Sequence, residues 1–78
     1  MATIASAVNT VFTPAVGDFI VQCATGVASI QRRSSAGAAW TNVGVLTGND
    51  SPIISNPVSG AQYQFTVISG TPVVQADQ

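Results

Sequence analysis

The side chains that could do chemistry in this sequence are few and widely spaced. Both arginines, Arg32 and Arg33, and the only tryptophan, Trp40, lie in one stretch, SIQRRSSAGAAWTNVG, at residues 29–44. The chain has no histidine, one cysteine and three acidic residues. It therefore has no imidazole base for neutral pH, and its scattered aspartates make no convincing carboxylate pair. We expect no enzymatic activity and no catalytic residues.

Metal and cofactor sites also lack their usual ligands. Cys23 is alone, so no internal disulfide is possible, and it is predicted to be a small buried hydrophobic residue. Asp50, in the loop TGNDSP at residues 47–52, is one carboxylate where a strong calcium site needs several. Two arginines are too few for the cationic contacts on which binding to nucleic-acid phosphates depends. We expect no metal, no cofactor and no nucleic-acid partner.

The arginine–tryptophan stretch admits several interpretations. Adjacent strand residues point to opposite faces, so Arg32 and Arg33 cannot form one double-arginine patch. One of them could pair with Asp18 or Asp50, and the other could be solvated, contact a neighbouring subunit or bind a ligand. Trp40 is interpreted as a core anchor, or alternatively as an interface hot spot or a stacking platform for a sugar. These three residues are candidate subunit contacts.

Short alternating segments that would position these side chains recur at intervals of roughly 8–12 residues. Turns rich in Gly, Pro, Asn and Ser separate them. The segments are residues 18–25, 27–34, 39–46, 53–55, 61–69 and 72–77. About six or seven short antiparallel strands of this kind predict an all-β fold, either a small β-sandwich or a barrel.

Neighbouring segments also predict hairpins and a core. The expected hairpins join residues 19–25 to 27–34, residues 27–34 to 40–46, and residues 61–68 to 71–76. The predicted core residues are Phe19, Val21, Ile30, Trp40, Val43, Val45, Ile54, Tyr63, Phe65, Val67 and Val73.

The first 16 residues are less periodic than the rest. We expect residues 1–16 to form an N-terminal arm or added strand and residues 17–78 to form the β-domain. Within the arm, Val11 and Phe12 are candidate subunit contacts. The N-terminus is not typical of a secretory signal, and the longest apolar runs fall far short of the ~20 residues that span a bilayer. We expect no membrane partner.

Size and charge both favour association with other subunits. A domain of 78 residues buries only roughly 60–65% of the surface that its unfolded chain exposes, so its own core is small. Only 6% of the residues are charged, whereas about a quarter is usual for a soluble domain. Because disulfides and metals are not expected, contacts with further subunits are the remaining source of stability.

Two segments of the chain carry a resemblance to known proteins. The stretch GDFIVQCATGVASIQRRSSAGAAWTNVG, followed by NPVSGAQYQFTVISGTPVVQADQ, resembles the small neutral β-proteins of tailed bacteriophage virions. The shared elements are Gly17–Gln22, Ser29–Ser34, Ala36–Trp40 and Gly60–Thr71.

The resemblance implies a non-enzymatic structural protein of the virion. The capsid decoration (cement) type is favoured, which implies an oligomer, with a homotrimer preferred, that binds the major capsid protein or another virion protein and stabilises the shell. It also implies synthesis in the host cytoplasm and a final place on the capsid surface. The alternative is a tail or head fibre component that contacts a host surface glycan.

Overall fold

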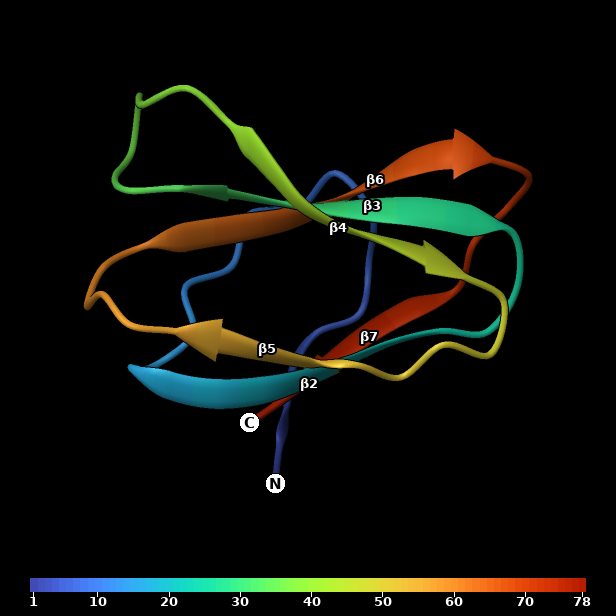
Figure 1. Ribbon diagram of the computed structural model, residues 1–78, viewed down its shortest axis with the longest axis horizontal. Coiled ribbons are helices and arrows are strands. Elements are labelled where there is room, and N and C mark those ends of the chain that lie inside the picture. Colours follow the sequence, from blue (N-terminus) through green and yellow to red (C-terminus); the bar gives the residue numbers. More distant parts are fainter.

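Seven β-strands form two facing antiparallel sheets in the computed structural model of residues 1–78 (Figure 1). The strands are β1 (Thr3–Ala5), β2 (Gly17–Cys23), β3 (Val27–Arg33), β4 (Thr41–Thr47), β5 (Ile53–Asn56), β6 (Gln62–Ser69) and β7 (Val74–Asp77). One sheet has the order β1-β7-β2-β5 and the other β4-β3-β6. No helix long and apolar enough to cross a membrane is present. The predicted all-β sandwich is confirmed, and the sheets do not close into a barrel.

The core lies between the two sheets and is centred on aromatic rings. The ring of Phe12 stacks on that of Phe65 with centroids 5.6 Å apart, and Phe19 meets Tyr63 edge-on at 5.0 Å. The buried apolar residues are Phe12, Phe19, Val21, Cys23, Ala28, Ile30, Leu46, Ala61, Tyr63, Phe65, Val74 and Ala76. This list confirms the predicted burial of Phe19, Val21, Cys23, Ile30, Tyr63 and Phe65.

Other predicted core residues lie outside this cluster. The exposed ones are Val43, Val45, Val67 and Val73, and the half-buried ones are Trp40 and Ile54. On β4 the prediction is wrong because the inward positions are Gly44 and Leu46, which lie opposite the buried Ile30 and Ala28 of β3. The register between β3 and β4 shifts just beyond Gly44. Alternation alone predicted that the valines of β4 point into the core, but the core packs against the other face of this strand.

One of the three predicted hairpins is confirmed. Strands β3 and β4 pair as expected, but β2 pairs with β5 and β7, and β6 pairs with β3. The links from β2 to β3 and from β6 to β7 therefore cross from one sheet to the other. Gly26 and Gly70, with φ of +65° and +70°, lie side by side in these two links, and a side chain on Gly26 would press on the Ser69 carbonyl. Short links between alternating segments look alike in sequence whether they turn within a sheet or between sheets.

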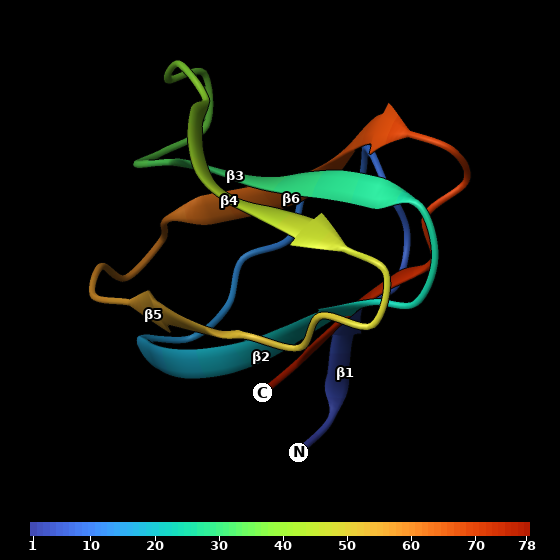
Figure 2. The ribbon, with the colours of Figure 1, turned by 45° about the vertical axis from the view of Figure 1, so that its right-hand side comes forward.

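Residues 1–16 pack against the β-domain of the same chain. Strand β1 pairs with β7, and further along, Asn9 and Phe12 donate backbone hydrogen bonds to the carbonyls of Phe65 and Tyr63 on β6. This segment thus crosses from the edge of one sheet to the edge of the other (Figure 2). Asn56, fully buried, donates to the carbonyls of Pro14 and Ala15 and so fixes the end of the segment to β5.

Candidate interaction surface

Arg33 and Trp40 form a stacked pair beside the turn between β3 and β4. The guanidinium carbon of Arg33 lies 4.4 Å from the centroid of the indole ring, which is within cation–π range. Its Nε also donates a 2.8 Å hydrogen bond to Oε1 of Gln62 on β6. Trp40 is half-buried and is absent from the core cluster, so its interpretation as a core anchor is wrong. The indole covers the arginine on the outside of the sandwich.

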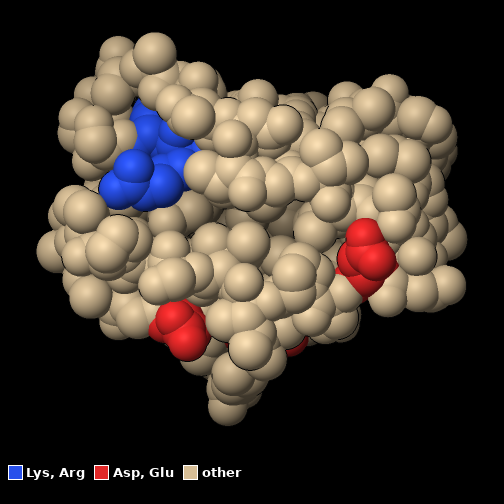
Figure 3. Space-filling view, in the orientation of Figure 1, with Lys and Arg blue, Asp and Glu red and all other residues tan.

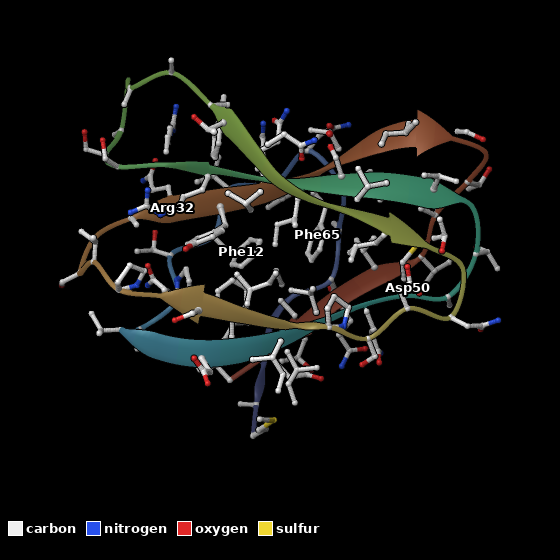
Figure 4. All side chains as sticks on the ribbon, in the orientation of Figure 1. Phe12, Arg32, Asp50 and Phe65 are labelled. Carbon is white, nitrogen blue, oxygen red and sulfur yellow. The ribbon has the colours of Figure 1, made fainter.

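Arg32 points to the opposite face, as the strand geometry predicts. It follows the inward residues Ala28 and Ile30 on β3, and its half-buried side chain lies at the open end of the space between the sheets (Figure 4). Its buried Nε has no hydrogen-bond partner. No ion pair forms between either arginine and Asp18 or Asp50. Figure 3 shows the two cations side by side with no acidic side chain in contact with them.

A ladder of polar side chains covers the outer face of strands β3 and β6. Its three rungs, here called the outer ladder, are Ser29–Thr66, Gln31–Gln64 and Arg33–Gln62. In each rung the two residues are direct cross-strand partners, and Gln64 Nε2 donates to Gln31 Oε1 at 2.9 Å. The ladder satisfies polar groups without using any ion pair. The rungs of the outer ladder are therefore polar, and they are uncharged except at the Arg33 end.

Asp50 closes the turn that follows β4. Its Oδ2 accepts hydrogen bonds from the backbone N–H of Thr47 at 2.8 Å and from the Thr47 hydroxyl at 2.9 Å. The first and then the second of these bonds favour the charged form and hold the pKa of the Asp50 carboxyl below its ordinary value. The carboxylate thus stabilises the turn by accepting both hydrogen bonds from Thr47.

The one cleft of the molecule lies beside this turn. It measures about 260 Å³ and is lined by Gln22, Cys23, Ala24, Asn49, Asp50 and Ser51. The Cys23 thiol donates to the Thr25 carbonyl at 3.0 Å, and Asp50 is the only acidic side chain in the lining. No cluster of three or more His, Cys, Asp or Glu side chains occurs anywhere in the fold.

The two candidate contacts in the N-terminal segment, Val11 and Phe12, differ in how exposed their side chains are. Phe12 is 7% exposed and belongs to the core of its own chain, so little of its ring is left for a neighbour. Val11, next to it, is 42% exposed. Of the five candidate contacts, only Arg33 and Trp40 are brought together.

The sequence prediction missed two surface features. It placed the valines of β4 in the core, although they are exposed, and it did not find the outer ladder. A signal for the ladder exists, since polar residues recur with period two in SIQRR and in QYQFT. Nothing in the sequence showed that these two segments pair.

Comparisons with protein-family models, with curated proteins and with solved structures find no match. The function of this chain therefore has to be inferred from its own residues.

Proposed function

We propose that this chain is a non-enzymatic structural protein of a bacteriophage virion, of the capsid decoration type, which binds other virion proteins and stabilises the shell. The sequence resemblance described above suggests the class, and one observation of the structure supports a contact role. Ten large apolar side chains are exposed, almost as many as the twelve buried apolar residues of the core.

These exposed residues are distributed over the molecule. They are Met1, Val11, Val16, Val43, Val45, Ile53, Val58, Val67, Ile68 and Val73. Complete burial of one aliphatic side chain of this size contributes about 1.5–3 kcal/mol. Several such residues covered by a neighbour would add an amount comparable to the 5–15 kcal/mol that stabilises a typical folded domain. A surface with five charged side chains offers little electrostatic opposition to such packing.

The proposal has a direct test in phage genetics and particle analysis. Mass spectrometry of purified particles should find the protein in stoichiometric ratio to the shell protein. Deletion of its gene should give particles that release packaged DNA at a lower temperature, and expression of the protein in trans should restore the wild-type release temperature. Absence of the protein from purified particles would overturn the proposal.

A second candidate, a tail or head fibre component that contacts a host glycan, is favoured by a different observation. The half-buried Trp40 lies at the end of the outer ladder, whose amide side chains are suited to hydrogen bonding with sugar hydroxyls. Against it, the guanidinium of Arg33 already occupies one face of the indole ring. Gene deletion separates the candidates, because loss of a fibre component would reduce adsorption to host cells and leave the DNA-release temperature unchanged.

A further inference from the structure

Three of the four sheet edges in this protein are protected against pairing with another strand. Strand β1 has only three residues, and β5 has four residues between Pro52 and Pro57. The first part of the β6 edge, at Tyr63 and Phe65, is covered by backbone hydrogen bonds from Asn9 and Phe12. Short strands, flanking prolines and covering segments are the usual means by which proteins prevent edge-to-edge association.

The fourth edge, β4, has none of these protections. It is seven residues long, lies at the end of the β4-β3-β6 sheet, and contains neither a charged residue nor a proline. Its exposed side chains include Val43 and Val45, which are 42% and 53% exposed. Its one edge protection is the register shift against β3 next to Gly44, since a β-bulge can twist an edge away from a partner. A long, neutral edge rich in β-branched residues is a ready template for another strand.

The sequence of β4 is almost symmetrical about its centre. It reads TNVGVLT, so that Gly44 is flanked first by Val43 and Val45 and, at the ends, by Thr41 and Thr47. If a second copy pairs antiparallel about Gly44, each Val43 faces Val45 of the other copy. The register shift next to Gly44 puts Thr41 and Thr47 on opposite faces, so regular pairing is confined to the residues around the axis. Four exposed valines would then meet around the two-fold axis, where cross-strand β-branched pairs are stabilising.

Charge is complementary in the same arrangement. Arg32 pairs with Thr41 across the β3–β4 ladder, so the cationic end of the molecule lies at the start of β4. Asp50 is hydrogen-bonded to Thr47, so the acidic turn lies at the other end (Figure 4). Antiparallel pairing places the arginine end of each copy against the Asp50 turn of the other, twice in one dimer.

We propose that β4 pairs antiparallel with β4 of a second copy and joins the two three-stranded sheets into one six-stranded sheet, β6-β3-β4-β4-β3-β6. The pairing uses the same edge of both copies about a two-fold axis, so this contact closes at two copies. This two-fold symmetry differs from the trimer that the phage resemblance implies. The proposal stands apart from the virion role, because the dimer forms in purified protein without any particle.

The test is the molar mass of the purified full chain by size-exclusion chromatography with light scattering, over a dilution series. Val45→Lys puts a charge on the edge of both copies and should give a monomer at concentrations where the wild type is a dimer. Ile68→Lys is the matched control, because Ile68 is 54% exposed and lies on β6, at the other edge of the same sheet. This control should remain a dimer, and high salt should shift the wild type toward monomer.

Other results would overturn the proposal. These are a wild type that is monomeric at every concentration, a wild-type trimer, or a Val45→Lys variant with the mass of the wild type. Circular dichroism should show the same β-spectrum for all three proteins.

A second measurement tests the register and does not depend on the folding of Val45→Lys. In the proposed pairing, residue 43 of one copy faces residue 45 of the other. Mixed Val43→Cys and Val45→Cys proteins should therefore form disulfide-linked heterodimers with oxidised glutathione more than either variant alone. Wild type is the control, because its single cysteine, Cys23, is 1% exposed. Equal crosslinking in the mixture and in the separate variants would contradict the register.

Discussion

The inner and outer faces of the β4-β3-β6 sheet are made by alternate residues of the same strands. On β6, Tyr63 and Phe65 point inward and are fully buried, whereas Gln62 and Gln64 point outward into the outer ladder. The inner face excludes water and provides most of the hydrophobic stabilisation. The outer face keeps exposed valines, paired amides and a stacked arginine. Because neighbouring residues of one strand belong to these two different faces, substitutions one position apart should differ in their effect on stability.

The largest expected effect is on the inner face. Phe65→Ala removes a fully buried ring that stacks on Phe12 and should lower the free energy of unfolding by about 3–5 kcal/mol. Its matched control is Gln64→Ala, one residue away on the outer ladder, which should cost about 0.5–1.5 kcal/mol because it removes one exposed-face hydrogen bond. Urea denaturation followed by circular dichroism measures both. Equal losses at the two positions would contradict the division between the faces.

A smaller effect is expected at the polar residue inside the sandwich. Asn56 accepts a hydrogen bond from the Tyr63 hydroxyl at 3.3 Å and donates to the carbonyls of Pro14 and Ala15 at 3.2 and 3.1 Å. Asn56→Ala removes the partner of the Tyr63 hydroxyl and of the Pro14 carbonyl, while the Ala15 carbonyl keeps its hydrogen bond from Gln78, and it should cost about 2–3 kcal/mol in the same denaturation experiment.

The control for this substitution is an exposed residue of the same strand. Ser55→Ala, next to Asn56 on β5, should change the free energy of unfolding by less than about 0.5 kcal/mol. Hydrogen exchange should also become faster at Phe12, whose N–H bonds to β6, since Asn56 holds the end of that segment. Unchanged exchange at Phe12 would contradict the anchoring role of Asn56.

On the outer face, Trp40→Ala should have a modest effect. The indole is half-buried and stacks on Arg33, so its removal should cost about 1–2 kcal/mol from lost burial and cation–π attraction. Trp40→Phe keeps an aromatic face for the arginine and should recover part of the loss. A loss above about 3 kcal/mol would instead be the signature of a core residue.

Strand alternation predicted the fold class and the buried face of β2 and β6, because period two is a local property of the chain. It failed on β4, where both faces carry residues of similar hydrophobicity and only the partner strand decides which face is covered. It also failed on two of the three hairpins, because the links that contain Gly26 and Gly70 cross between the sheets. Pairing between β3 and β6 joins residues 29 or more positions apart, and local patterns do not carry that information.

The candidate contact residues could also be predicted only where local strand geometry decides their orientation. Strand geometry alone showed that Arg32 and Arg33 point to opposite faces, and the structure confirms it. The stacking of Arg33 on Trp40 required the length and path of the hairpin turn at residues 34–40. The burial of Phe12 required the return of the N-terminal segment to β6, which no local pattern indicated.

The smallest effect concerns Asp50, at the end of β4 opposite to the arginines. Hydrogen bonds from Thr47 lower the pKa of its carboxyl in the folded state relative to the unfolded chain. A lowered folded-state pKa gives stability that is present above the unfolded pKa and is lost as the pH falls through the folded pKa. The free energy of unfolding of the wild type should therefore decline in the acid range, with Asp50 contributing part of the decline.

Asp50→Asn separates this contribution from other acid effects. An amide oxygen can still accept from Thr47 but does not titrate, so the variant should be slightly less stable at neutral pH and should lose less stability on acidification. Asp18→Asn, on an exposed position of β2, is the matched control for removal of one negative charge. Urea midpoints measured from neutral to acid pH give the comparison, at low protein concentration so that monomers are compared. If the urea midpoints of the wild type and Asp50→Asn depend on pH in the same way, the charge of Asp50 does not contribute to the loss of stability in acid. Its role would then be limited to the proposed pairing of β4 with a second copy.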